Sequence, residues 1–237
     1  MSEPLLHMAG VEAGYGKIQV LWGVDLDVAQ GETVVLLGPN GAGKTTTLKC
    51  LQGLLPARGG RIVFRGEDIT SFSARRRVQL GLSYMSELGI FPELTIEENL
   101  DLGALFVERG MARWRIAQLF ELFPILHERR RHLAGSLSGG QRKMLGIAKA
   151  LAAEPKLLVM DEPSAGLAPV LVSAVIKSLA GFRAEGLAML IAEQNVKFLE
   201  LGDRASTMEK GRIGFTGTPA EIAADDGLRR AYFGLGV

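Results

Sequence analysis

The sequence predicts an α/β protein built around a parallel or mixed sheet, and three observations lead to this prediction. Short apolar runs bounded by glycine, such as residues 32–37, are typical of buried strands. That run leads directly into a glycine-rich loop of the form G-x-x-x-x-G-K-S/T, which joins a strand to a helix. The chain has 237 residues, enough for one large α/β domain or for a core with a small subdomain.

The N-terminal part of the chain is expected to contain several strands and one helix. The strands are bounded by glycine-containing turns, and the helix begins directly after the glycine-rich loop. Cys50, the lone cysteine, lies on the apolar side of this helix and is expected in the core. The expected strands lie at 5–31 (short pieces around Tyr15), 32–37, 61–64 and 82–85, and the expected helix lies at 44–55.

The middle of the chain is expected to be helical, and strands resume after it. Thr95 and Glu98 form a capping box that opens a helix, and Thr218 and Glu221 form a second box that opens the last one. Pro124 ends an amphipathic pattern. The expected helices lie at 95–108, 112–122, after Pro169 and after Thr218; the expected strands lie at 156–160 and 187–191, with a β-hairpin at 206–217.

The glycine-rich loop predicts a phosphate-binding site. Its glycines let the backbone turn and approach a phosphate closely, and the free N–H groups at the start of the next helix favour anions. Lys44 would contact the β- and γ-phosphates of a nucleotide, and the Thr45 hydroxyl can ligate Mg²⁺. The candidate nucleotide-binding residues are Gly38, Pro39, Asn40, Gly41, Ala42, Gly43, Lys44, Thr45 and Thr46.

Two adjacent carboxylates, Asp161 and Glu162, follow another apolar run. In open parallel sheets, ligands bind at the carboxyl ends of the strands. We therefore expect Asp161 to hold Mg²⁺ through water, and Glu162 to orient and polarise the water that attacks a phosphate. The alternative is a solvated pair at a strand end, before the turn residues Pro163 and Ser164, but the phosphate loop upstream favours the catalytic interpretation.

A third motif, Leu137-Ser138-Gly139-Gly140-Gln141, offers a hydroxyl and backbone N–H groups at the start of a helix. Alone, it would be interpreted as an ordinary serine-glycine helix cap. In this order, however, the three motifs resemble those of the ATP-binding-cassette (ABC) ATPase family, and the resemblance covers residues 5–235. In that family the third motif, the signature, contacts the γ-phosphate bound by the other subunit. The resemblance therefore implies that Ser138, Gly139, Gly140 and Gln141 bind ATP across a dimer.

The resemblance also implies a detailed architecture. The expected fold is a P-loop NTPase core with a mixed or parallel sheet, an antiparallel β subdomain and an inserted α-helical subdomain. Residues 1–86 and 157–237 would form the nucleotide-binding core, and residues 87–156 would form the helical subdomain that ends with the signature helix. Tyr15 stands where the family stacks an aromatic ring on adenine; the alternative is an aromatic residue at a strand end.

Two positions depart from the commonest cassette pattern. Glu87 occupies the place of a hinge glutamine, and Gln194 occupies the place of a histidine after the 187–191 strand. A carboxylate at position 87 can ligate Mg²⁺ or orient water, and the Gln194 amide can donate a hydrogen bond to the γ-phosphate. Both are therefore catalytic candidates together with Glu162. The histidines that lie away from the expected catalytic positions, and are expected on the surface, are His7, His127 and His132.

These departures, with residues 91–100 and 164–169, are similar to the ATPases of branched-chain amino-acid importers. ATPases of urea and short-amide importers share much of the pattern, and Leu88-Gly89 differs from the Gly-Arg that is usual in the group. The implied function is hydrolysis of ATP, with Mg²⁺, to drive amino-acid uptake through a separate permease. The alternatives are a urea or short-amide importer, an exporter of lipid or polysaccharide, and a soluble cassette that acts in DNA repair or translation.

The implied partners are a second cassette (another copy or a non-identical paralogue), two membrane-spanning permease subunits and, through them, a solute-binding protein. The net charge of +1 argues against nucleic acid. No apolar stretch approaches the ~20 residues of a membrane span, so the implied location is cytoplasmic, peripheral on the inner face of a prokaryotic plasma membrane. The apolar residues expected to line a permease-docking groove, unless they pack the helical subdomain, are Leu88, Ile90, Phe91 and Leu94.

Overall fold

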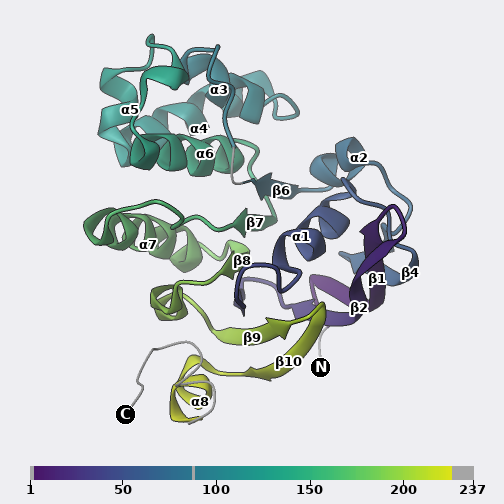
Figure 1. Cartoon of the computed structure of the whole chain (residues 1–237). Helices are drawn as coiled ribbons and strands as arrows, with labels where there is room; N and C mark the ends of the chain where they lie inside the picture. Colours follow the sequence, from purple (N-terminus) through teal and green to yellow (C-terminus); the bar gives the residue numbers. More distant parts are fainter. Residues whose placement is uncertain (1–2, 87–88, 226–237) are drawn as a thin grey trace.

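A six-stranded sheet runs through the centre of the molecule in the computed structural model, which describes residues 3–86 and 89–225 (Figure 1). The strand order is β10-β9-β3-β8-β7-β6; the strands from β9 to β6 are parallel, and β10 pairs antiparallel with β9. The strands are β3 (Thr33–Leu37), β6 (Leu82–Met85), β7 (Leu157–Asp161), β8 (Ala188–Glu193), β9 (Arg204–Glu209) and β10 (Arg212–Gly217). The predicted mixed sheet and C-terminal hairpin are confirmed.

Every residue of β3, β7 and β8 is buried, because both faces of the sheet are covered. Side chains alternate along β3, so that Val34 and Leu36 enter one hydrophobic core while Val35 and Leu37 enter the other. The first core also contains helix α1 (Lys44–Gln52), and the second contains α6 (Gly139–Ala152) and α7 (Pro169–Ala184). This two-sided burial explains why the central strands are continuous apolar runs in the sequence.

A second, four-stranded sheet has the order β2-β1-β4-β5 and is antiparallel. The short strands expected over 5–31 are in fact two long ones, β1 (Leu6–Tyr15) and β2 (Ile18–Val28), followed by β4 (Gly59–Phe64) and β5 (Glu67–Asp68). The register of β1 shifts between Met8 and Val11, where Gly10 has a φ of 57°. Such a bulge inserts an extra residue, so the alternation of apolar residues is interrupted although the strand continues.

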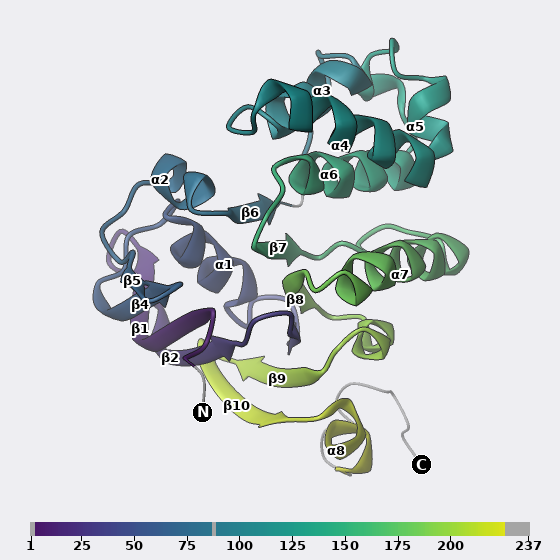
Figure 2. The same cartoon turned by 180° about the vertical axis from the view of Figure 1, so that it is seen from behind.

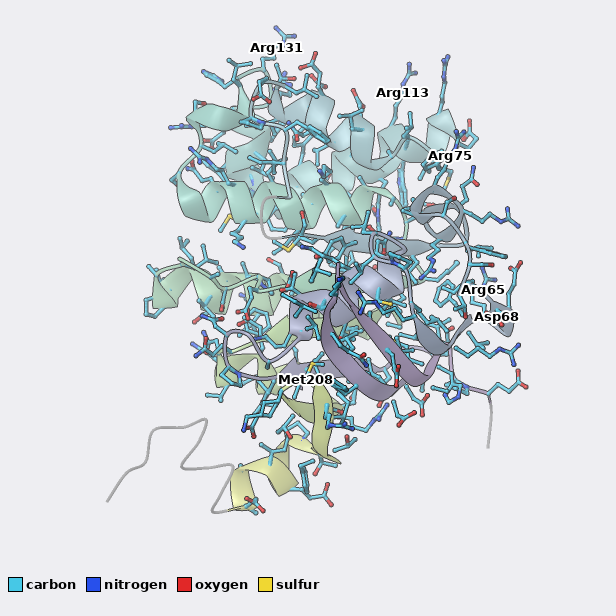
Figure 3. All side chains as sticks on the ribbon, turned by 45° about the vertical axis from the view of Figure 1, so that its right-hand side comes forward. Arg65, Asp68, Arg75, Arg113, Arg131 and Met208 are labelled. Carbon is cyan, nitrogen blue, oxygen red and sulfur yellow. The ribbon has the colours of Figure 1, made fainter. Side chains whose placement is uncertain are left out.

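Four helices form a group beyond β6 and β7, and one of them, α6 (Gly139–Ala152), packs against the central sheet (Figures 1 and 2). The capping box at Thr95 and Glu98 is confirmed, but its helix ends at 103 rather than 108. A side chain at Gly103 would collide with the backbone of Lys149 in α6, so these helices pack closely at that point. In Figure 3, Arg113 and Arg131 extend from the outer end of the group. The helices are α3 (Ile96–Gly103), α4 (Arg109–Leu122), α5 (Pro124–Glu128) and α6.

Pro124 follows the end of the amphipathic helix α4, as predicted, and it also begins a further helix, α5. It occupies the first turn of α5, where its missing N–H has no partner to lose. Short 3₁₀ turns follow at Ala134–Ser136, before the signature motif, and at Val196–Glu200, after β8. The second capping box, at Thr218 and Glu221, opens α8 (Pro219–Ala224) as predicted. Among the described residues, no helix is both long and apolar enough to cross a membrane.

Helix α1 ends at Gln52 rather than at 55, because Gly53 adopts the left-handed conformation with a φ of 74°. A short helix that the sequence did not predict, α2 (Ala74–Gln79), lies beside this end. Its Arg77 is 2% exposed and donates hydrogen bonds to the carbonyls of Cys50 and Leu51, 2.9 and 2.6 Å away. The same guanidinium also donates to two carbonyls outside the helix, those of Phe72 and Thr70.

Cys50 is 1% exposed, as expected for a small core residue. Burial raises the pKa of its thiol to about 11, while the nearby Arg77 lowers it. The thiol is therefore protonated at neutral pH and is a poor nucleophile, because the reactive form of cysteine is the thiolate.

Candidate nucleotide-binding site

The phosphate loop connects β3 to α1, as its sequence predicted, and its glycines are required for two different reasons. Gly43 has a φ of 112°, a conformation that other residues rarely adopt. Gly38 has no room for a side chain, because a Cβ there would lie 2.6 Å from the carbonyl oxygen of Met208. The loop is thus held tightly between the first turn of α1 and strand β9.

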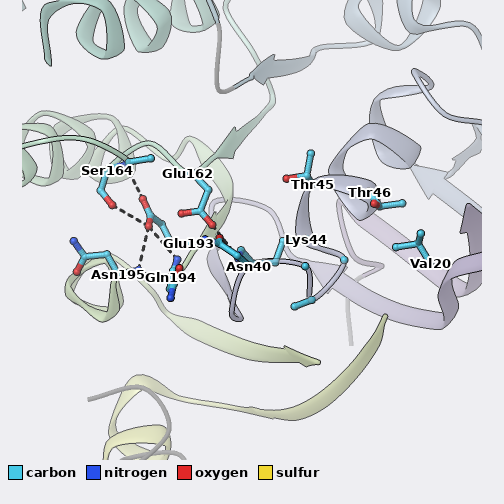
Figure 4. Close-up of a pocket in the computed structure, with 14 residues that line it drawn as sticks. Val20, Asn40, Lys44, Thr45, Thr46, Glu162, Ser164, Glu193, Gln194 and Asn195 are labelled. Atoms are coloured by element: carbon cyan, nitrogen blue, oxygen red, sulfur yellow. Dashed lines mark hydrogen bonds and ion pairs between the residues drawn. The ribbon is translucent and has the colours of Figure 1, made fainter. Parts of the chain in front are cut away.

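Lys44 links this loop to the carboxylate that follows β7. Its side chain is only 4% exposed, and its Nζ donates to the carbonyl oxygens of Gly38 at 2.7 Å and Pro39 at 3.2 Å. The same Nζ forms an ion pair with Glu162 Oε1 at 2.9 Å (Figure 4). Two residues that are far apart in the sequence are therefore in direct contact, as expected for parts of one phosphate site.

Asp161 lies beside the first turn of α1. The Thr45 hydroxyl donates to Asp161 Oδ1 at 3.0 Å, and the Tyr84 hydroxyl donates to Asp161 Oδ2 at 3.1 Å. Burial raises the pKa of Asp161, and these two hydrogen bonds oppose that shift. A hydroxyl and a carboxylate that lie together suit Mg²⁺, which prefers oxygen ligands and takes the rest from phosphates and water. In the described part of the chain, no group of three or more acidic, histidine or cysteine residues is arranged to hold a metal ion by itself.

Glu162 has a strained backbone. Its φ is 48°, in the left-handed region that is uncommon for residues other than glycine. Its amide donates to the carbonyl of Ala192 in β8 at 2.9 Å, and its own carbonyl accepts a hydrogen bond from Lys143 Nζ of α6, also at 2.9 Å. The neighbouring strand and the signature helix thus hold Glu162 in a conformation that turns its side chain toward Lys44.

A cavity of about 870 Å³ opens beside these groups. Gln194 lines it, as its place in the sequence predicted, and it follows β8 directly. Figure 4 shows that the residues after β7 and β8 face the phosphate loop across this space. The cavity is lined by Val20, residues 40–46, Glu162, Ser164, Ala165, Glu193, Gln194 and Asn195.

The structure does not place the signature motif in this cavity. Ser138 caps α6 and forms a capping box with Gln141. In it, the backbone N–H of Gln141 donates to Ser138 Oγ at 3.3 Å. Gly140 packs against α7, where a Cβ would lie 2.5 Å from Leu171 Cδ1. Ser138 and Gly139 are exposed, and the described lining of the cavity includes neither of them.

The other residues predicted from the sequence lie outside the cavity lining, on the surface or outside the described residues. Tyr15 is 45% exposed and is not part of the described cavity lining, although Val20 of the paired strand β2 is. Glu87 and Leu88 lie outside the described residues. The three histidines that were expected on the surface are all exposed: His7, His127 and His132.

Among the residues of the site that were not singled out from the sequence, five have polar side chains. Glu193 and Tyr84 stand at or near the ends of buried strands, the same signal that identified Asp161, so this rule could have found them. The remaining three depend on how loops and helices meet, and no local pattern indicates them: Lys143, Ser164 and Asn195.

The sequence of the chain is similar to those of known proteins over nearly its whole length. The chain is 38% identical to the high-affinity branched-chain amino acid transport ATP-binding protein BraG of Pseudomonas aeruginosa, covering 97% of this chain and 100% of that protein. It is 34% identical to a probable branched-chain amino acid transport ATP-binding protein, LivF, of Archaeoglobus fulgidus, covering 98% and 99%. It is also 39% identical to the lipopolysaccharide export system ATP-binding protein LptB of Haemophilus influenzae, covering 97% of both chains.

Similar structures have the same fold. The crystal structure of the ADP conformation of an ATP-binding cassette of an ABC transporter superposes with a TM-score of 0.85, at 28% identity, over 98% of this chain and all of that one. Residues 21–165, which include the phosphate loop, the signature and both carboxylates, match the family described as ABC transporter. On this evidence and on the geometry of its phosphate site, the chain belongs to the ABC transporter family and is one of its nucleotide-binding, ATP-hydrolysing subunits.

Proposed function

We propose that this ATPase powers uptake of branched-chain amino acids through separate permease subunits. The observation that carries the proposal is the similarity to BraG and LivF, which spans nearly the whole of all three chains. The departures at Glu87 and Gln194 and the 91–100 and 164–169 segments support it, since they resemble the same group of importers. The urea and short-amide importers remain the nearest alternative within that group.

In this proposal the chain's own residues divide the work on ATP. Lys44 and the amides of residues 41–45 bind the phosphates, because the loop presents N–H groups and a buried positive charge. Glu162 accepts a proton from the attacking water and orients it. Gln194 donates its amide N–H to the γ-phosphate. Thr45 and Asp161 would hold Mg²⁺, which supplies charge neutralisation at the phosphates, and Glu87 would assist at the hinge.

The signature would act on a second cassette. The lining of the chain's own cavity includes none of the four signature residues Ser138, Gly139, Gly140 and Gln141, and the first two are exposed. We therefore assign them to the γ-phosphate bound by a partner, which is a second copy or a LivG-like paralogue. Residues 1–86 and 157–237 would move as the nucleotide-binding core, residues 87–156 as the helical subdomain, and Tyr15 would stack on adenine.

The permease would dock between these two parts, at the inner face of a prokaryotic plasma membrane. An apolar cavity of about 420 Å³ lies there, and Met85, Ile90 and Pro92 line it. Phe91 is 50% exposed, which suits an anchor for a short permease helix. Ile90, in contrast, packs partly against the core, so the apolar residues near the hinge divide between packing and docking. A solute-binding protein would act on the far side of the permease.

Export of a lipid or polysaccharide is the second candidate, because LptB is as similar to this chain as BraG is. Reconstitution separates the two. The chain is purified with the membrane subunits encoded beside its gene, and ATPase activity is measured with leucine-loaded binding protein or with lipopolysaccharide. Stimulation by the loaded binding protein supports import; stimulation by lipopolysaccharide alone would overturn the proposal.

A further inference from the structure

Glu193 is a buried carboxylate whose hydrogen bonds all go to the loops around the nucleotide cavity. It is the last residue of β8 and is 0% exposed. An unpaired charge in such a place would be very costly, and a carboxylate accepts about four hydrogen bonds when fully satisfied. The identity of its donors therefore shows what this residue holds in place.

The first two donors belong to Ser164. Its amide donates to Glu193 Oε1 at 2.7 Å, and its hydroxyl donates to Oε2 at 2.9 Å. Ser164 is two residues beyond Glu162 and is itself buried. The turn that carries the catalytic glutamate is thus fixed at its far end by Glu193, while its near end is fixed by strand pairing to Ala192.

The other two donors are the amides of Gln194 and Asn195, each 3.1 Å from Oε2 (Figure 4). They fix the backbone that presents the Gln194 side chain to the cavity. The backbone carbonyl of Glu193 also accepts a hydrogen bond from the amide of Gly38, at 3.3 Å. One residue therefore contacts the phosphate loop, the turn after Glu162 and the turn after β8.

We propose that Glu193 is a positioning residue for ATP hydrolysis, which sets the spacing between Glu162 and Gln194 without touching the nucleotide. This inference rests on the assignment of Glu162 and Gln194 under Proposed function. A residue that only filled space could be apolar, as its neighbours in β8 are. Burial raises the pKa of its carboxyl and the hydrogen bonds from Ser164 lower it, so the donors from the two turns offset part of the cost of burying the group.

The test is a set of steady-state measurements on Glu193→Gln, which keeps the shape but turns an acceptor into a donor facing N–H groups. We expect kcat to fall about 10- to 100-fold, because small misplacements of catalytic groups have effects of that size. KM and the binding of a fluorescent ATP analogue should stay within about twofold, because the phosphate loop still binds. Unchanged kcat, or a loss of kcat matched by an equal loss of nucleotide affinity, would overturn the proposal.

Three further variants make the result specific. Ser164→Ala removes one donor and should also lower kcat, but by a smaller factor than Glu193→Gln does. When the two substitutions are combined, their effects should be less than additive, and additive effects count against the proposal. If Glu193→Gln does not fold, the kcat of Ser164→Ala decides the question. Asp203→Asn is the matched control, since Asp203 accepts the amide of Thr33 at the other end of β3; it should change the melting temperature but not kcat. If Glu162→Gln keeps full activity, the site assignment itself fails; if only Glu193→Gln does, the positioning role fails.

Discussion

The carboxyl end of the central sheet, where the phosphate loop lies, and the start of helix α6, where the signature motif lies, are built in opposite ways. At the sheet, Lys44 and Glu162 are in contact and partly or fully buried. At the helix, Ser138 and Gly139 are exposed, and the side chain of Ser138 is hydrogen-bonded to Gln141 within the helix itself. In the first region, side chains from distant parts of the sequence contact one another. In the second, the described hydrogen bonds of Ser138 shape the helix start and leave its exposed surface open.

The two regions suit two different tasks. A site that must hold a nucleotide tightly needs fixed groups, which the buried strands supply. Groups that would engage only when two cassettes meet need a preformed but exposed helix start, and the capping box at Ser138 shapes that start with contacts inside α6. If the two regions act separately, a substitution in one should leave the function of the other intact.

The largest effect is expected from Glu162→Gln. The amide keeps the shape but cannot accept a proton from water, so turnover should fall about 10²- to 10⁴-fold while ATP binding persists and an ATP-bound dimer accumulates. Phosphate release and size-exclusion chromatography with ATP measure both. Glu209→Gln, at an exposed position in β9, should behave like the wild type. Near-normal hydrolysis by Glu162→Gln would show that another group is the base.

Ser138→Arg compares the two regions directly with Lys44→Ala. Loss of Lys44 should weaken ATP binding within one chain, whereas arginine at Ser138 should leave that binding intact and block hydrolysis by about 100-fold or more, since it blocks the face that meets a partner's phosphate. Equilibrium binding and ATPase assays separate these outcomes. Ser73→Arg, which changes the exposed cap of α2, is the control. Equal loss of binding in both variants contradicts a division between the regions.

A smaller effect is expected from Gln194→His. Histidine changes charge near its unperturbed pKa of ~6.5, whereas the amide does not titrate. The wild-type ATPase rate should therefore lack an inflection near that pH, and the variant should gain one without losing activity. A pH–rate profile from pH 5.5 to 8 checks this. If the wild type shows the inflection and loses it on mutation of an exposed histidine such as His132, then Gln194 is not the residue that faces the γ-phosphate.

The smallest effect on the isolated chain is expected from Phe91→Ala. The ring is half-exposed and lies 4.7 Å from Lys149 Nζ, a contact worth about 0.5–1 kcal/mol at an exposed site. ATPase activity should be unchanged and the melting temperature nearly so, while copurification of the permease weakens. Val170→Ala, at a more exposed apolar position, should leave assembly intact. A variant that melts several degrees lower yet assembles normally would place Phe91 in the core.

Much of the sheet could be predicted from the sequence, because a strand buried on both faces leaves an unmistakable apolar run. Residues 33–37, 157–161 and 188–193 are such runs, and each is followed directly by a residue that was predicted for the site: Gly38, Glu162 and Gln194. The antiparallel sheet was harder. In β1 the bulge near Gly10 shifts the alternation, so one long strand looks like several short ones.

The site was predictable where chemistry follows a strand or a glycine-rich loop directly, as at Lys44 and Asp161. It was not predictable where the roles depend on contacts between distant segments. Lys143 of α6 donates to the carbonyl of Glu162, the residue after β7, and Ser164 meets Glu193 only because β7 and β8 are neighbours. Helix α2 was missed for a related reason, since six residues carry little periodicity and Arg77 faces inward.

The hydrogen bonds that Arg77 donates to four carbonyls limit the substitutions that this position can accept. Helix α1 begins at the phosphate loop, and the carbonyls near its C-terminal end accept hydrogen bonds from the Arg77 guanidinium. Different parts of the protein therefore hold the two ends of this helix. Lysine has the same charge but offers three donors from a single atom, which cannot serve four carbonyls set around a planar fork. Arg77→Lys, although conservative by charge, should thus loosen α1 from its far end. A variant screen would then find intolerance at a position that never approaches the nucleotide.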